Sequence, residues 1–275
     1  MNLLEAHRIT FERGGQRVLE NIDLALAEGQ FLGIIGPNGA GKTSLLRILA
    51  GLEAPSGGQV LCAGEPLASM AAARRARHLG YHAQNPELHW SLRVSDILRL
   101  GRVPHQGALL RHDQADNAAI ARAVAMTGLG PLLKRRGDSL SGGELARVHI
   151  ARLLAGEHRV LLADEPIANL DPRFQIDVMN LLRQHAAQGG ANVVVLHDLA
   201  IAARFCDALI LMDQGRVHAA GTPAEVLTST HLSTVFGVGG DYWQLSGIPA
   251  ALDLREPLEA ERRRARSAAS RSASD

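Results

Sequence analysis

The stretch Gly36-Pro-Asn-Gly-Ala-Gly41-Lys42-Thr43 decides the fold of this chain. It matches an eight-position pattern that is typical of loops binding the phosphates of a nucleotide. It follows the apolar run Phe31–Ile35, which we predict to be a strand, and it precedes the helix-like stretch Ser44–Leu52. This order favours phosphate binding, because the main-chain N–H groups and the positive end of the helix then face one anion.

Each residue type in this loop has a physical role in holding a phosphate chain. Glycines let the backbone turn so that successive N–H groups point inward. The Lys42 ammonium would neutralise the outer phosphates, and the Thr43 hydroxyl is suited to coordinate Mg²⁺. A glycine-rich turn that binds nothing is the weaker alternative, given the flanking strand and helix. The predicted phosphate-binding residues are Gly36, Pro37, Asn38, Gly39, Ala40, Gly41, Lys42, Thr43 and Ser44.

A second apolar run ends in two carboxylates, in the stretch Val160-Leu-Leu-Ala-Asp164-Glu165-Pro166. We expect Asp164 to hold Mg²⁺, and Glu165 to orient or deprotonate the water that attacks the last phosphate. His197 ends the next apolar run, Val193–Leu196, and would sense that phosphate if the two runs are neighbours in one sheet. Strand ends of this kind are often structural, so these residues gain weight only beside the glycine-rich loop.

Alternating apolar runs and amphipathic stretches predict an α/β fold with a mainly parallel sheet. Short runs without polar alternation are typical of strands covered on both faces. The first 30 residues, with the alternating run Arg8–Phe11 and the turn Gly14–Gly15, predict antiparallel β structure beside that sheet. Residues from about 86 to 158 are mostly helix-forming, and we interpret them as a helical subdomain inserted into the sheet domain.

Composition disfavours several classes of protein. The 275 residues carry a formal net charge of +1 and 3% aromatic residues, so a nucleic-acid binder that relies on basic surface or base stacking is not expected. The two cysteines are distant and predict no disulfide framework. No apolar run reaches the roughly 18–20 residues that span a bilayer, so we expect any membrane role to be peripheral. The Arg-, Ala- and Ser-rich stretch Glu256–Asp275 predicts a disordered end.

The stretch Leu140-Ser-Gly-Gly-Glu144 stands at the start of the predicted helix Glu144–Ala155. It is similar to the signature motif of ATP-binding cassette (ABC) ATPases. With it, the other positions fall into the order of that family, which is the glycine-rich loop, Gln84, the signature, Asp164–Glu165, Asn169-Leu-Asp171 and His197. The resemblance covers about residues 1–240 and leaves 241–275 as a C-terminal extension.

The resemblance implies a P-loop NTPase of the ABC type that hydrolyses ATP with Mg²⁺. It implies catalytic roles for Gln84, Glu165 and His197, and Mg²⁺ ligation by Thr43, Gln84 and Asp164. Two chains of this family pack head to tail, so the ATP on one glycine-rich loop would also meet residues of the other chain, namely Ser141, Gly142, Gly143 and Asp171. The implied partners are transmembrane permease subunits and, indirectly, a substrate-binding protein. The implied location is peripheral, on the cytoplasmic face of the inner membrane, and no nucleic-acid partner is expected.

Two stretches resemble ATPases that energise import of iron chelates, haem and cobalamin. They are Gly101-Arg-Val-Pro-His105 and Leu232-Ser-Thr-Val-Phe-Gly-Val238. Three alternatives remain, which are a transporter ATPase with a different cargo, a soluble ABC ATPase acting on nucleic acid or ribosomes, and an ATP-binding module without turnover. The last is disfavoured because the charged and titratable site residues are all present.

Two positions depart from the family pattern. The signature ends in Glu144, where Gln is usual, and we expect a small effect because this position is less directly involved with phosphate. An aromatic side chain often stacks on adenine in this family, and ungapped alignment puts Arg13 there. Either the planar guanidinium of Arg13 stacks on the base, or Phe11 substitutes for it.

Overall fold

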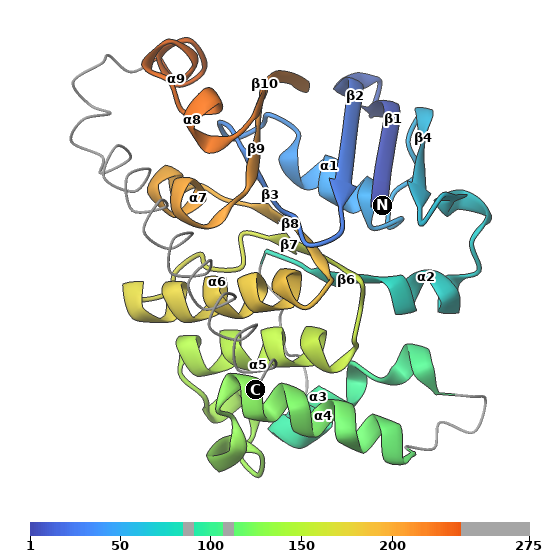
Figure 1. The fold of residues 1–275 in the computed structure, drawn as a ribbon, viewed down its shortest axis with the longest axis vertical. Coiled ribbons are helices and arrows are strands. Elements are labelled where there is room, and N and C mark those ends of the chain that lie inside the picture. Colours follow the sequence, from blue (N-terminus) through green and yellow to red (C-terminus); the bar gives the residue numbers. More distant parts are fainter. Residues whose placement is uncertain (85–90, 107–112, 238–275) are drawn as a thin grey trace, which may run out of the picture.

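The computed structural model describes residues 1–84, 91–106 and 113–237 of the chain. Its centre is a six-stranded sheet with the strand order β10-β9-β3-β8-β7-β6 (Figure 1). Five of these strands are parallel, and β10 alone is antiparallel to its neighbour β9. The strands are β3 (Phe31–Ile35), β6 (Leu79–His82), β7 (Val160–Asp164), β8 (Ala191–Val195), β9 (Ala208–Asp213) and β10 (Arg216–Gly221). The predicted α/β class and mainly parallel sheet are therefore confirmed.

A second, antiparallel sheet lies beside the first, in the order β2-β1-β4-β5. Its strands are β1 (Asn2–Arg13), β2 (Gln16–Ala27), β4 (Gly57–Cys62) and β5 (Glu65–Pro66). The sequence predicted the first pair from the alternation and turn of the opening 30 residues. It did not predict β4 and β5, which are a short strand and a two-residue strand.

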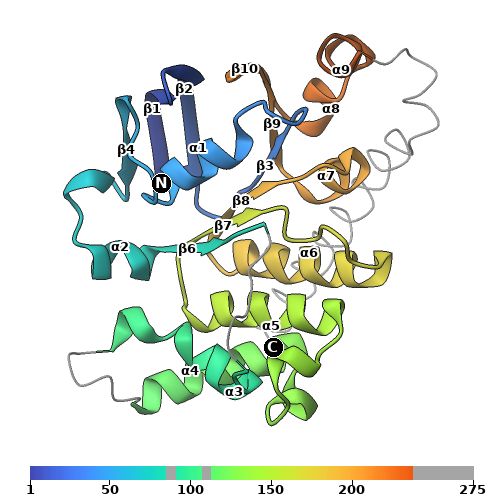
Figure 2. The ribbon, with the colours of Figure 1, turned by 180° about the vertical axis from the view of Figure 1, so that it is seen from behind.

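Helix α1 (Lys42–Leu49) lies between the two sheets, as both views show (Figures 1 and 2). Its apolar side chains join a core formed with the antiparallel sheet and one face of the central sheet. The other face is covered by α6 (Pro172–Ala187) and α7 (Leu199–Phe205), which form a second core with β3, β7 and β8. The buried strands carry almost continuous apolar side chains because both faces of the sheet are covered.

A helical layer packs beyond α6 and consists of α3 (Val94–Leu100), α4 (Gln114–Thr127) and α5 (Gly142–Ala155). These helices share a third, small core. Helix α5 also contributes Ile150 and Leu153 to the second core, so it joins the helical layer to the central sheet. Within 91–106 and 113–158 the structure contains no strand, only an isolated bridge between Arg93 and Arg136.

Three further short α-helices are α2 (Ala72–His78), α8 (Pro223–Val226) and α9 (Ser229–Phe236). Across the described ranges, every helix is too short or too polar to cross a bilayer. The predicted disordered end and residue 238 of the second importer-like stretch lie outside the described residues.

Candidate nucleotide-binding site

The glycine-rich loop runs from the end of β3 to the start of α1, at the carboxyl edge of the parallel sheet. Gly36 has φ 145° and Gly41 has φ 92°, which are conformations that residues with a Cβ rarely adopt. Space also requires glycine here, since a Cβ on Gly36 would lie 2.2 Å from the Met212 carbonyl oxygen. A Cβ on Gly41 would lie 2.6 Å from Leu19 Cδ2. The loop is therefore fixed by its neighbours on β2 and β9.

Lys42 is the first residue of α1 and is 6% exposed. Its Nζ donates hydrogen bonds of 2.8 Å to the carbonyl oxygens of Gly36 and Pro37. Burial lowers the pKa of Lys42, and the carboxylates of Glu165 and Asp164 oppose that shift. The ammonium is thus held inside the curve of the loop, close to both carboxylates.

A pocket of about 300 Å³ opens above this loop. Gln84 and Glu165 come to it from the ends of β6 and β7, so residues distant in sequence line one cavity. Its remaining lining residues are Val18, Asn38, Gly39, Gly41, Lys42, Thr43 and Ser44. Val18 was not predicted from the sequence, because it is a single half-buried residue of β2 and carries no pattern of its own.

Asp164 ends β7 and is 1% exposed. Its Oδ1 has no hydrogen-bond partner among the described residues. Burial raises the pKa of Asp164, the Thr43 hydroxyl opposes that shift by a hydrogen bond, and the Glu165 carboxylate adds to it. A buried carboxylate oxygen without a partner, beside a hydroxyl, fits a Mg²⁺ ion, which prefers hard oxygen ligands and usually retains waters and phosphate oxygens.

Glu165 lies between the other two predicted catalytic residues. Its Oε2 accepts a hydrogen bond of 2.8 Å from Gln84 Nε2, and its Oε1 lies 2.5 Å from His197 Nε2. These side chains follow the adjacent strands β6, β7 and β8, because parallel strands bring their carboxyl ends to one edge. Glu165 has φ 48°, a left-handed conformation that is uncommon for a residue with a Cβ and is found at functional sites.

Ser141 begins α5 through a capping box. Its Oγ accepts a hydrogen bond of 3.3 Å from the Glu144 N–H, while its own N–H donates to Glu144 Oε2 at 3.0 Å. This main-chain hydrogen bond is the leading cause that lowers the pKa of Glu144. Glu144, the departure from the family signature, thus completes the helix cap as an anion.

The remaining signature residues and Asp171 lie apart from the pocket. Gly142 is exposed and Gly143 is buried, and both are in the first turn of α5. Asp171 is exposed and caps α6, but its side chain makes no capping hydrogen bond. None of these three residues, nor Ser141, lines the pocket above the glycine-rich loop.

Arg13 and Phe11 occupy different environments. Phe11 is 9% exposed and belongs to the core of the antiparallel sheet. Arg13 lies over the Phe11 ring, with Cζ 5.4 Å from its centroid. Its Nη2 donates to both carboxylate oxygens of Glu53 at 2.8 Å, and about half of its side chain is exposed. Of the two candidates for stacking on adenine, only Arg13 therefore lies at the surface.

Comparison with known proteins agrees with this arrangement. A family model described as ABC transporter matches residues 19–168, which is more than half of the chain. The chain belongs to the ABC transporter family. The hemin import ATP-binding protein HmuV of Pseudomonas entomophila is 43% identical over 241 residues, covering 86% of this cassette and 93% of that protein. The HmuV protein of Bordetella pertussis is 39% identical over 262 residues, covering 90% and 97%.

Solved structures support the same fold for the cassette. A dimeric bacterial ABC transporter cassette matches with a TM-score of 0.71 at 27% identity, covering 80% of this chain and 98% of that one. A nucleotide-free cassette from an ABC transporter matches with a TM-score of 0.74 at 22% identity, covering 86% and 96%.

Proposed function

We propose that this chain is the ATP-hydrolysing subunit of an importer for haem, within the wider class of iron-siderophore, haem and cobalamin substrates. The observation that carries the proposal is the similarity to hemin import ATP-binding proteins, at 39–43% identity and over at least 86% of this chain. The proposed cargo rests on those relatives alone, because the described site would bind the nucleotide and not the cargo.

ATP hydrolysis would use the residues around the pocket in separate roles. Lys42 and the main-chain N–H groups of the glycine-rich loop hold the β- and γ-phosphates. Thr43, Asp164 and Gln84 would hold Mg²⁺, which would neutralise charge on the phosphates when bound. Glu165 takes a proton from water as the water oxygen attacks the γ-phosphorus and the bond to the β–γ bridging oxygen breaks. His197 holds Glu165 in place through its Nε2 and faces the same phosphate.

Two copies would act together, head to tail. Ser141, Gly142 and Gly143 open α5 with main-chain N–H groups that form an anion-binding helix start. They do not line the pocket of their own chain, so a second copy would bring them to its ATP. The similarity to a dimeric cassette supports this assembly.

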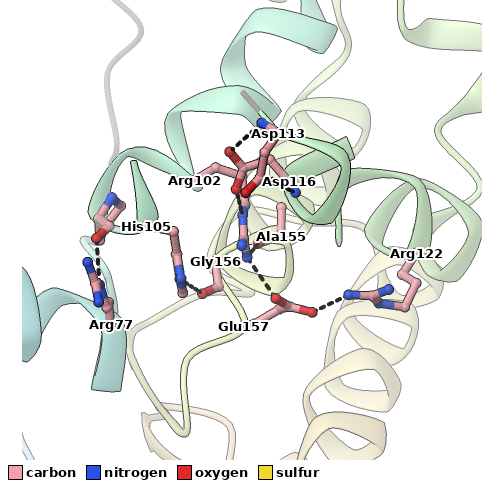
Figure 3. Close-up of polar contacts among 10 residues, drawn as sticks. Arg77, Arg102, His105, Asp113, Asp116, Arg122, Ala155, Gly156 and Glu157 are labelled. Carbon is pink, nitrogen blue, oxygen red and sulfur yellow. Dashed lines mark hydrogen bonds and ion pairs between the residues drawn. The ribbon is translucent and has the colours of Figure 1, made fainter. Parts of the chain in front are cut away.

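A permease would contact the loop Gly101–His105, which a charge network centred on the buried Arg102 links to the end of α5 (Figure 3). Arg102 Nε donates to Asp116 Oδ1 at 2.7 Å, and its Nη1 donates to the Ala155 carbonyl at 2.9 Å and to Glu157 at 2.8 Å. The Arg102 side chain is 5% exposed. A force applied to the loop would therefore reach the helix that begins with the signature.

Apolar side chains beside this network support the permease contact. Leu100 and Val103 are 44% and 47% exposed, and they are two of the few large apolar side chains at the surface of the described chain. Exposed apolar side chains suit contact with a membrane protein, and they support the proposed peripheral location on the cytoplasmic face of the inner membrane. A substrate-binding protein would act on the far side of the permease.

Uptake in reconstituted vesicles tests the function. The chain would be assembled with its transmembrane permease subunits, and haem, a ferric siderophore and cobalamin would each be offered with a loaded binding protein. The proposal predicts ATP-dependent accumulation of haem, and no accumulation with the Glu165→Gln variant. Accumulation of another cargo, or ATP turnover that responds to nucleic acid or ribosomes instead, would contradict it.

A further inference from the structure

Phe174 joins the start of α5 to the start of α6. It lies in the first turn of α6, three residues after Asp171. A Cβ placed on Gly143 would lie 2.5 Å from Phe174 Cδ2 and 2.7 Å from Cε2, so the Gly143 backbone packs directly on the ring. Arg147 lies one helical turn further along α5, and its Cζ is 5.4 Å from the centroid of the same ring. The ring thus fills a slot between Gly143 and Arg147, which share one face of the helix.

The ring explains why position 143 is glycine. Gly143 has a helical backbone that any residue can adopt, and its φ is outside the left-handed region. A Cβ on its neighbour Gly142 would meet no atom within 4 Å, so the two glycines of the signature differ in their surroundings. Glycine is therefore required at 143 because a Cβ there would overlap the Phe174 ring, and not because of the backbone conformation.

Arg147 completes the contact from the other side. Its Nε is buried and has no hydrogen-bond partner among the described residues. The guanidinium faces the Phe174 ring, whose π-system attracts a cation. The ring is consequently held by backbone at one end of the slot and by charge at the other.

We propose that Phe174 is a positioning residue that fixes the signature turn, Ser141–Gly143, relative to Asp171. The two groups that one chain offers to the other would then move as a single unit when the dimer closes. This inference rests on the head-to-tail dimer of the proposed function. It adds a residue outside the recognised motifs, and a reason for one of the signature glycines.

A double-mutant cycle tests the contact. The Glu165→Gln chain is the parent, and the ATP-dependent dimer dissociation constant is measured by analytical ultracentrifugation with Mg²⁺. Gly143→Ala should weaken the dimer by about ten-fold or more, because the new methyl displaces the ring and with it the turn. Phe174→Ala should weaken it by a few-fold. The double variant should be no weaker than Phe174→Ala, since the methyl then has room.

Gly142→Ala is the matched control, because no side chain faces it. Its effect should simply add to that of Phe174→Ala. The monomer affinity for ATP should stay within about two-fold in every variant, since the glycine-rich loop is untouched. Phe174→Leu repeats the cycle with a side chain that keeps part of the packing, in case the alanine variant does not fold.

The outcomes separate this inference from the proposed function. If the effects of Gly143→Ala and of Gly142→Ala both simply add to that of Phe174→Ala, the positioning role is overturned. A parent chain that forms no dimer with ATP would overturn the head-to-tail assembly, and the positioning role with it. Loss of ATP affinity in the Phe174 variants would show a general structural effect and would also count against the proposal.

Discussion

Glu165 Oε1 lies 2.5 Å from His197 Nε2, and the second oxygen of the same carboxylate accepts a hydrogen bond from Gln84. One carboxylate thus links the ends of three adjacent strands at the mouth of the nucleotide pocket. The left-handed backbone of Glu165 costs about 1–3 kcal/mol relative to ordinary conformations, and the sheet maintains it. Substitutions at this carboxylate and at its neighbours separate the roles of these contacts.

Replacing Glu165 by Gln should retain ATP binding and slow turnover by about 10²-fold or more. The amide keeps the shape of the side chain but cannot accept a proton from the attacking water. Phosphate release and calorimetric ATP affinity measure the two effects, and size-exclusion chromatography with ATP should show an accumulated dimer. Normal turnover in this variant would remove Glu165 from its assigned role.

Replacing His197 by Ala should also slow turnover by about 10²-fold while ATP affinity changes little, because Glu165 loses the partner that holds it. Asp198→Ser is the control, since Asp198 only caps α7 by accepting from the Ile201 N–H at 2.9 Å. Serine can form the same cap, so turnover should remain within about two-fold. If the two variants lose activity equally, the effect comes from the strand end and not from the imidazole.

Replacing Arg13 by Ala should raise the dissociation constant for ATP by about three- to ten-fold, because the exposed guanidinium can stack on adenine. Arg13→Lys should behave like the alanine variant, since the lysine ammonium keeps the positive charge but has no planar group that can stack on the base. Arg17→Ala is the control, because this nearby arginine is equally exposed and makes only long ion pairs of 3.6 and 3.7 Å. Calorimetry with ATP and GTP would measure affinity and base selectivity. Unchanged affinity for Arg13→Ala would mean that the base is held elsewhere.

Two buried histidines should make the fold sensitive to acid. Burial lowers the pKa of His149 to about 3 and that of His158 to about 4, with nearby Arg152 and His105 adding to the respective shifts. The unfolded chain binds protons at these positions below the ordinary pKa of about 6.5, whereas the folded chain does not. The contribution of these two histidines to the free energy of unfolding is therefore fully present above that pH, and it is lost as pH drops from about 6.5 toward 4.

Denaturant unfolding at a series of pH values measures this effect. Each histidine should contribute a slope of about 1.4 kcal/mol per pH unit in the free energy of unfolding. His149→Phe removes one titrating group and should lower the slope by that amount between pH 5.5 and 4. A slope unchanged by the substitution would show that His149 is protonated in the folded chain.

The sequence predicted the parts of the fold that depend on local pattern. Apolar runs without alternation located β3, β7 and β8, and the glycine-rich loop located the start of α1 to within two residues, because both signals lie within a few residues. The short strands β4 and β5 have no comparable signal. β4 forms by pairing with the free edge of β1, a contact distant in sequence, and β5 then pairs with β4.

The candidate site shows the same limit. Lys42 and Asp164 stand in recognisable stretches, whereas Gln84 had no signal of its own and entered only through the family resemblance. Gln84 and His197 both reach Glu165 because their strands flank β7 in the sheet. This strand order cannot be predicted from local sequence. The choice between Arg13 and Phe11 depended on burial of the ring, and the Gly143–Phe174 contact depended on how α5 packs on α6.

The head-to-tail site is tested most directly by mixing two inactive chains. Lys42→Ala should not bind ATP tightly, and Ser141→Arg should block the helix start that a second copy offers. In a mixed dimer, the glycine-rich loop of the Ser141→Arg chain meets the intact signature of the Lys42→Ala chain, which restores one complete site. An equal mixture should recover roughly a quarter of the wild-type ATP turnover, because half of the dimers are mixed and each has one of two sites. No recovery at any mixing ratio would contradict the account.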